Sequence, residues 1–203
     1  MSVGRLGQRL FAWRRHPTAY RVLVAEILLQ HTPADRVALV FEEVMARWQG
    51  FVALAGARQT EVERVLRPLG LHRRRAAALV RLARAVVRLH GGRLPRRREV
   101  LERLSGVGRY TAGATLAVTI SRADGFADAG MGRLVRRYFG AATATHREVH
   151  ELVRQVLAGR GARWRLWGLL DVARTYCRPV PDCGRCKLVR GCAHVALRPK
   201  RTA

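Results

Sequence analysis

The chain of 203 residues carries 39 Lys+Arg against 14 Asp+Glu, a formal net charge of +25, and 49% of its residues are hydrophobic. This composition supports a packed core, which excludes a wholly disordered chain, and no apolar run approaches the roughly 20 residues of a membrane span. The positive excess favours a polyanionic partner, with a solubility surface or a genomic bias toward arginine as the alternative.

Helical periodicity runs through the sequence and no alternating strand pattern competes with it, so we predict an all-α fold. The predicted helices span residues 20–30, a segment capped by Asp35, 61–66, 74–90, 97–104, a segment ending at Ile120, 134–139, 148–157 and 164–176. The helix after Asp35 should bury Val37, Val40, Phe41, Val44, Met45 and Trp48, and the helix over 74–90 should bury Leu79, Leu82, Val86 and Leu89.

Glu26 is the one charged residue in the apolar run from Val22 to Leu29. Burial among these neighbours would raise the pKa of Glu26 and suit it to donate a proton or to position a water molecule. The alternative is a solvent-facing glutamate on an ordinary amphipathic helix.

Two glycines bracket one apolar residue in Gly106-Val107-Gly108, between two predicted helices. Such a turn tolerates positive φ and directs backbone N–H groups outward, beside the start of the following helix, where they can bind a phosphate. Val107 would pack back between the helices. A plain helical hairpin has the same sequence pattern, so the turn alone does not establish DNA binding.

All four cysteines lie in one short segment, Cys177-x5-Cys183-x2-Cys186-x5-Cys192. A disulfide framework would spread its bridges over the fold, so the clustered thiols indicate a metal site in a reducing compartment. Four thiolates can bind a [4Fe–4S] cluster or a tetrahedral Zn²⁺. Zinc ribbons mostly use two Cys-x-x-Cys pairs and this segment has one, which favours iron–sulfur.

Four ordered motifs between about Ala19 and Cys192 resemble those of the endonuclease III superfamily of helix-hairpin-helix DNA glycosylases. Leu104 to Thr111 is similar to the family hairpin, with Ser105 at the usual proline, and Glu26 to Thr32 is similar to Glu-x-x-Leu-Gln-Gln-Thr, with His31 at the second glutamine. The cysteine loop and its lead-in at 167–172 match as well, although the first cysteine gap is one residue shorter than in the family.

The resemblance implies two helical lobes that flank a DNA-binding cleft. One lobe would comprise residues 19–122, with the helix-hairpin-helix at 97–120. The other would comprise residues 1–18 and 123–203, with the cysteine segment at 177–192.

The resemblance also places the family's essential aspartate at Asp128, which lies 18 residues after Tyr110. A fixed carboxylate can stabilise the cationic sugar that develops as an N-glycosidic bond breaks, or activate the attacking water. The alternative is an N-cap for the following helix. Gly130 stands where the family usually has Asn or His. The target base would be inserted toward Glu26, Tyr110 and Asp128.

Bifunctional members of the family carry a lysine where this chain has Tyr110, and that amine forms a Schiff base with the sugar. A phenol cannot form this imine, and neither of the two lysines, Lys187 and Lys200, matches a family nucleophile. The resemblance therefore implies a monofunctional glycosylase, which leaves an abasic site without cutting the strand.

DNA contacts are implied for the hairpin and for two further loops. Gln30 would fill the space left by the flipped base, and Leu71 would intrude into the duplex unless it is an ordinary core residue. The complete set is Gln30, His31, Leu71, His72, Gly106, Val107, Gly108, Arg109 and Thr111.

The chain's size and Tyr110 resemble the thymine–guanine mismatch glycosylases most closely. We therefore expect excision of thymine or uracil opposite guanine, with an adenine glycosylase acting opposite guanine or 8-oxoguanine as the alternative. A non-catalytic DNA-binding protein on the same scaffold, or less readily a zinc-bound transcription factor, would also fit the basic charge. The expected partner is double-stranded DNA containing a mismatched or damaged base, bound by a monomer in the cytoplasm at the nucleoid, with no membrane association.

Overall fold

The computed structural model describes residues 11–122 and 125–197. Every regular element in these ranges is helical, which confirms the all-α prediction. The chain divides into two compact units that meet in sequence between Ile120 and Ser121. No helix of the described residues is long and apolar enough to cross a bilayer.

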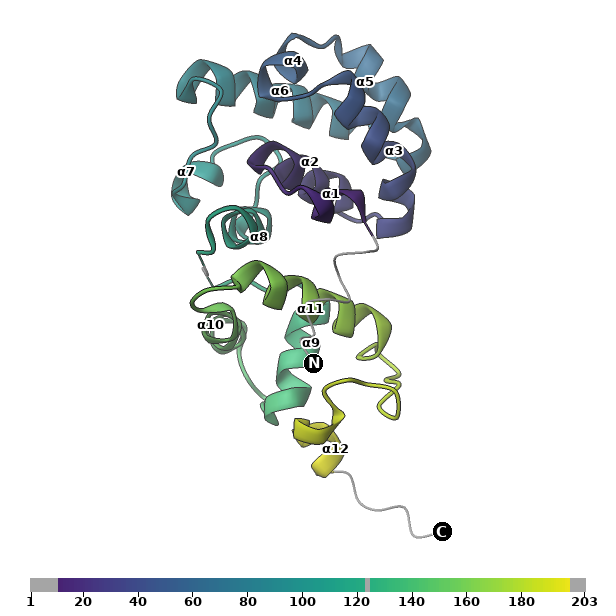
Figure 1. Cartoon of the computed structure of the whole chain (residues 1–203), viewed down its shortest axis with the longest axis vertical. Coiled ribbons are helices and arrows are strands. Elements are labelled where there is room, and N and C mark those ends of the chain that lie inside the picture. The colour runs from purple at the N-terminus through teal and green to yellow at the C-terminus, as the bar shows by residue number, and fades with distance from the viewer. Residues whose placement is uncertain (1–10, 123–124, 198–203) are drawn as a thin grey trace. The chain divides into compact units, whose positions relative to one another are not determined.

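The N-terminal unit is built around its longest helix, α6, against which α4 and α5 pack (Figure 1). Helix α2 packs against α8 and α3. The elements of this unit are α1 (Ala12–Arg15), α2 (Ala19–Leu29), α3 (Ala34–Arg47), α4 (Phe51–Gly56), α5 (Gln59–Leu66), the 3-10 helix η2 (Arg67–Leu69), α6 (His72–His90), α7 (Arg98–Leu101) and α8 (Arg109–Ile120).

The apolar faces predicted for α3 and α6 are buried, with one exception. The five predicted positions of α3 from Val37 to Met45, and Trp48 at its C-cap, are at most 7% exposed, and Leu79, Leu82 and Val86 of α6 are fully buried. Leu89 is 62% exposed, so its predicted burial is wrong. It lies in the last turn of α6, beyond the final fully buried position at Val86.

Residues 11–18, which precede α2, lie within the N-terminal unit, although the predicted boundary placed residues 1–18 with the C-terminal lobe. Phe11 and Trp13 stack with ring centroids 4.6 Å apart, and Trp13 meets Phe41 of α3 edge-on at 5.3 Å. These aromatic contacts bury both side chains in the N-terminal core. Residues 1–10 of the predicted segment lie outside the described residues.

Several predicted helix ends differ from those observed because capping residues set the starts. Pro33, not Asp35, occupies the N-cap of α3, and Asp35 lies in the first turn. Thr145 is the N-cap of α10 in a capping box with Glu148, so the helix begins at His146, two residues before the predicted start. The predicted helix over 97–104 shortens to α7, and α4 was not predicted at all.

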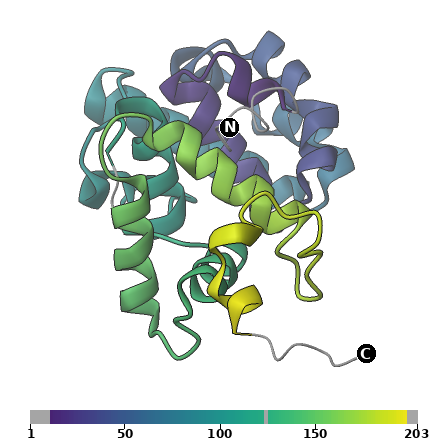
Figure 2. The same cartoon turned by 60° about the horizontal axis from the view of Figure 1, so that its bottom comes forward.

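The C-terminal unit is a three-helix arrangement in which α9, α10 and α11 contact one another. Figure 2 shows the short connection between α10 and α11, the two green helices. Helix α12 packs against α9. The elements are α9 (Ala129–Phe139), α10 (His146–Leu157), α11 (Ala162–Thr175), the 3-10 helix η3 (Val189–Gly191) and α12 (Ala193–Ala196).

Candidate nucleic-acid interface and catalytic residues

The glycine turn before α8 has the geometry expected of a phosphate-binding hairpin. Gly106 adopts a left-handed φ of +80°, and Val107 is buried with its N–H donating to Leu104 O at 3.1 Å. Val107 therefore packs inward as predicted. Gly106, Gly108 and Arg109 are exposed at the start of α8, and the two glycines carry the turn amides that a phosphate could meet.

Gln30 joins the end of α2 to this hairpin. Its Nε2 donates to Gly106 O at 2.8 Å and to Thr111 Oγ1 at 3.3 Å. Thr111 is only 3% exposed, and its hydroxyl accepts a hydrogen bond from Gln30; its predicted contact with DNA stays a prediction. The structure thus brings together two of the segments predicted to bind DNA, and it does so through the Gln30 side chain.

Leu71 lies at the surface, which rejects the alternative that it is ordinary core. Its side chain is 59% exposed and its backbone is left-handed, at φ +47°, immediately before α6 begins. His72 next to it is half-buried, and His31 is exposed with φ +54°. An exposed leucine on a strained turn is a candidate for a contact with a partner.

Glu26 and Tyr110 lie on two helices that pack together, α2 and α8. Glu26 is half-buried, one helical turn before Gln30. Tyr110 is also half-buried and is the second residue of α8. Both predicted side chains therefore remain partly open to solvent within the N-terminal unit.

Asp128 is an exposed residue of the C-terminal unit and caps α9. Its Oδ1 accepts a hydrogen bond from Met131 N at 2.6 Å, so the N-cap interpretation is confirmed. The cap occupies one carboxylate oxygen. Gly130 leaves room for it, since a Cβ at that position would lie 3.3 Å from Asp128 Oδ1 and 3.4 Å from Ala173 Cβ.

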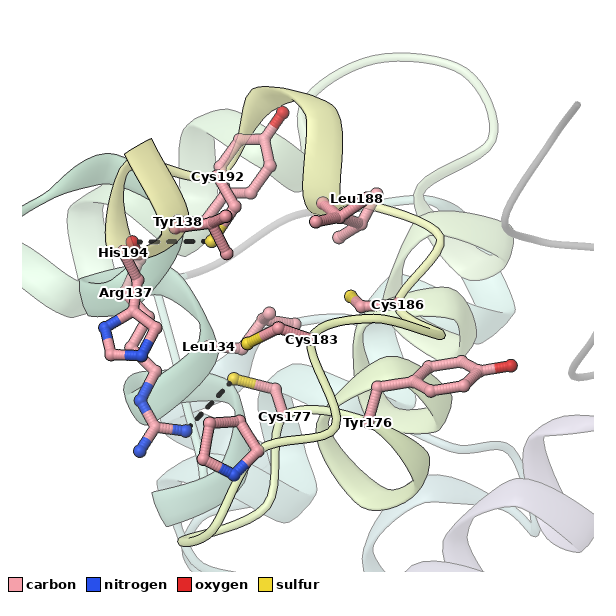
Figure 3. A pocket seen from close by; sticks show the side chains of 13 residues that line it. Leu134, Arg137, Tyr138, Tyr176, Cys177, Cys183, Cys186, Leu188, Cys192 and His194 are labelled. Carbon is pink, nitrogen blue, oxygen red and sulfur yellow. Dashed lines mark hydrogen bonds between the residues drawn. The ribbon is translucent and has the colours of Figure 1, made fainter. Parts of the chain in front are cut away.

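The four cysteines line a single small apolar cavity in the C-terminal unit, and Figure 3 shows their sulfur atoms facing the same space. Leu134, Tyr138, Tyr176 and Leu188 form part of the apolar wall. Burial raises the pKa of the Cys186 thiol, and the other three thiols act in the same direction. Within the described ranges, no three His, Cys, Asp or Glu side chains are arranged to hold a metal ion.

Two arginines of α9 donate hydrogen bonds to the start of the cysteine segment. Arg137 donates to Arg178 O at 2.7 Å and to Pro179 O at 2.9 Å, and it lies 3.6 Å from Cys177 Sγ (Figure 3). Arg133 donates to Cys177 O at 2.7 Å. The guanidinium group of Arg137 beside the Cys177 sulfur would offset part of the negative charge that thiolates bring to a bound cluster. The four thiols and the apolar wall are chemically compatible with a thiolate-bound group, although the described side chains are not arranged around one metal position.

Sequence reasoning missed Arg75, which is 6% exposed. A signal for it existed: Arg75 precedes Leu79, Leu82 and Val86 by four, seven and eleven residues, so it shares their buried face of α6. The run of arginines at 73–75 concealed one inward-facing member among outward-facing ones. A charged residue on the apolar face of a helix requires internal partners.

Comparison with known proteins identifies relatives over most of the chain. Residues 24–158 match the family described as HhH-GPD superfamily base excision DNA repair protein. A thymine/uracil-DNA glycosylase of Methanothermobacter thermautotrophicus is 30% identical over 192 residues, covering 92% of this chain and 87% of the relative. A thymine-DNA glycosylase of Aeropyrum pernix is 33% identical over 190 residues, covering 90% of this chain and 85% of the relative.

A solved structure shares this architecture. The structure of a thermostable thymine-DNA glycosylase aligns with a TM-score of 0.86 and 28% identity, covering 96% of this chain and 94% of that one.

Proposed function

The chain belongs to the HhH-GPD superfamily of base excision DNA repair proteins, and we propose that it is a monofunctional DNA glycosylase that removes thymine or uracil opposite guanine. The observation that carries the proposal is the similarity to two thymine glycosylases over at least 90% of this chain. The exposed glycine turn and the exposed Leu71 support it, because they supply a phosphate-binding element and a wedge.

Asp128 is the proposed catalytic carboxylate. As the C1′–N bond breaks, its electron pair leaves with the pyrimidine, the sugar becomes cationic, and water adds at C1′ and releases a proton. The carboxylate stabilises the cationic sugar electrostatically or accepts that proton. The hydrogen bond from Met131 N fixes the carboxylate and leaves its second oxygen for this role.

Glu26 is proposed to hold the attacking water or to assist the departing base. A thymine or uracil anion leaves without prior protonation of the ring, so a water-positioning role suffices for these bases. On adenine the same carboxyl group would have to act as an acid.

We also propose that the enzyme lacks lyase activity. Tyr110 takes the position of the Schiff-base lysine, and a phenol cannot form an imine with an aldehyde. Lys187 lies on the cysteine segment in the C-terminal unit, and Lys200 lies outside the described residues. Borohydride should therefore trap no covalent complex with DNA.

The cysteine segment is proposed to hold a [4Fe–4S] cluster through Cys177, Cys183, Cys186 and Cys192. Bound there, the cluster would act as a structural cross-link between the end of α11 and α12. The segment carries the exposed side chains of Arg178, Arg185, Lys187 and Arg190, which would then be held in place to meet phosphates. Iron and sulfide analysis of the purified protein tests the assignment, and stoichiometric zinc would reject it.

The decisive experiment incubates the protein with labelled duplexes that contain T·G, U·G, A·G or A·8-oxoguanine. Each product is analysed with and without alkali, because an abasic site breaks only after alkali treatment. Breaks at T·G and U·G that require alkali support the proposal, and adenine release would indicate the alternative substrate. No excision from any duplex, with DNA binding intact, would indicate a non-catalytic binder. Light scattering tests the proposed monomer of 22.8 kDa.

A further inference from the structure

Three non-glycine residues of the described ranges have a left-handed backbone, and two of them lie at the proposed DNA-binding surface. His31 has φ +54° and Leu71 has φ +47°; the third is Ser121. A left-handed conformation costs an L-residue free energy, and it persists only where the surroundings enforce it. Both side chains are exposed, so core packing of these side chains cannot be what enforces it.

The guanidinium group of Arg75 contacts both turns at once. Nη2 donates to Gln30 O at 2.5 Å and to Thr32 Oγ1, which flank His31. Nη1 donates to Gly70 O at 2.7 Å and to Leu69 O at 3.1 Å, which precede Leu71. One planar side chain thus binds the carbonyl group immediately before each left-handed residue.

This arrangement restrains the two strained dihedral angles directly. Rotation about the N–Cα bond of a residue turns the preceding peptide group, so a fixed carbonyl at the preceding residue fixes φ. The acceptors are three carbonyls and one hydroxyl, all neutral. They solvate the guanidinium group of a residue that is only 6% exposed, and they do so only as long as both turns keep their conformations. Releasing either turn would leave a buried cation short of acceptors.

Gln30 extends the connection to the hairpin. The carbonyl group of Gln30 accepts from Arg75, while its side chain donates to Gly106 O at 2.8 Å. The turn at His31, the turn at Leu71 and the glycine turn are therefore joined through two side chains within the N-terminal unit. Each of the three exposes groups that the proposed function assigns to DNA.

We propose that Arg75 is a positioning residue that couples the left-handed turns of His31 and Leu71, so that both side chains enter the duplex as one preformed unit. The role in the duplex rests on the proposed function, whereas the coupling of the turns does not. A lysine cannot substitute, because its compact ammonium group lacks the planar fork that reaches both turns.

The coupling is tested first without DNA, by hydrogen exchange with mass spectrometry on Arg75→Met and Arg75→Lys. We expect faster exchange in both turn segments, 28–33 and 68–73, in the methionine variant, and only partial protection in the lysine variant. Val86→Ala, a cavity at a fully buried position of the same helix, serves as the control for general destabilisation. Faster exchange confined to one turn, or no change in either, would overturn the coupling.

Thr32→Val provides a second variant in case Arg75→Met does not fold. It removes one acceptor of Arg75 and keeps the side-chain shape. We expect a smaller increase in exchange that nevertheless reaches segment 68–73, far from the substitution in sequence. An increase that stays within segment 28–33 would contradict the coupling.

The role on DNA is tested by base extrusion, followed with a 2-aminopurine reporter beside a T·G pair. We expect Arg75→Met to lower extrusion and single-turnover excision about tenfold or more, with affinity for undamaged duplex changed less than twofold. Combining Arg75→Met with Leu71→Ala should add little to either single loss, because both act through the same wedge. Fully additive losses would show that Arg75 does not act through the Leu71 wedge. If the wild-type protein excises no base, the proposed function fails while the exchange result still stands.

Discussion

At the scale of single residues, Asp128 caps α9 and is also the proposed catalytic carboxylate, two roles that ordinarily compete as explanations. Its Oδ1 caps α9 through Met131 N, and its carboxylate remains exposed. A cap and a catalytic group are compatible here because the hydrogen bond that starts the helix also fixes the orientation of the carboxylate. The two roles can be separated by choosing substitutions that retain one of them.

We predict that Asp128→Asn abolishes excision, by at least about 100-fold, and leaves both DNA binding and thermal stability near wild type. Asparagine caps helices about as well as aspartate, whereas Asp128→Ala should also cost about 1 kcal/mol of stability through the lost cap. Single-turnover excision and thermal melting of both variants measure the difference. If Asp128→Asn excises the base at a rate close to that of the wild type, Asp128 has no catalytic role.

The sequence predicted those parts of the candidate site in which the residue types themselves indicate the structure. The glycine turn and the cysteine segment each show in short patterns, because glycine and cysteine have chemistry that few other residues share, whereas the wedge role of Leu71 followed only from the family resemblance. Arg75 was missed because 37 of the residues of this chain are arginines, which hides one that faces inward. The motif of the turn does not predict the exposure of each residue in it: Arg109 is exposed, whereas Thr111 is buried.

At the scale of elements, Gln30 is the connection between α2 and the hairpin. Its side-chain amide donates to Gly106 O and Thr111 Oγ1. We predict that Gln30→Ala lowers the free energy of unfolding by about 1–2 kcal/mol, from roughly 1 kcal/mol per lost hydrogen bond. It should also speed hydrogen exchange in the hairpin at 104–109.

A matched control exists in the other unit. Gln155 donates only to the exposed Glu151, on the same helix, at 3.2 Å. Gln155→Ala should therefore change stability by no more than a few tenths of a kcal/mol, in line with about 0.2–0.5 for exposed helix pairs. Equal losses in the two variants would show that the effect of Gln30→Ala does not come from its contacts with the hairpin.

The start of α10 predicts how stability depends on pH. The backbone N–H and hydroxyl groups of Thr145 hold the pKa of Glu148 below its ordinary value, and Arg154 and Gln155 lower the pKa of Glu151 to about 2. A lowered carboxyl pKa contributes stability that is complete above the ordinary value and is lost as the pH falls below it. Unfolding should therefore become easier below about pH 4.5.

Glu148→Gln tests this assignment, since glutamine retains the capping box and does not titrate. Thermal melting between pH 3 and 7 at constant ionic strength should show the variant losing less stability on acidification than the wild type. Parallel profiles would mean that Glu148 does not contribute to the acid sensitivity. The sequence predicted most of the helices correctly. It placed the start of α10 too late, because the apolar periodicity that reveals a helix begins after the capping residue Thr145.

At the scale of the whole molecule, the net charge of +25 must be distributed between contacts that bind DNA and charge that only keeps the protein soluble. The N-terminal unit contains a groove of about 650 Å³ lined by Arg81, Arg84, Arg88 and Arg103. Arg81 Nε donates to Ser105 Oγ at 3.3 Å, and Ser105 adjoins the glycine turn. The groove therefore begins at the proposed phosphate-binding hairpin.

If a DNA strand continues from the hairpin into this groove, each arginine that meets a phosphate there releases condensed counterions on binding. The logarithm of the binding constant then falls with the logarithm of salt concentration, by about 0.9 per phosphate contact. We predict that Arg88→Gln reduces this slope by about 0.9, because Arg88 is exposed in the groove. Arg58→Gln removes the same charge from a side chain that is 81% exposed and paired with Glu61, so it should leave the slope unchanged. Equal slopes for the two variants would assign the groove arginines to solubility, and the DNA-binding charge would then have to lie elsewhere in the chain.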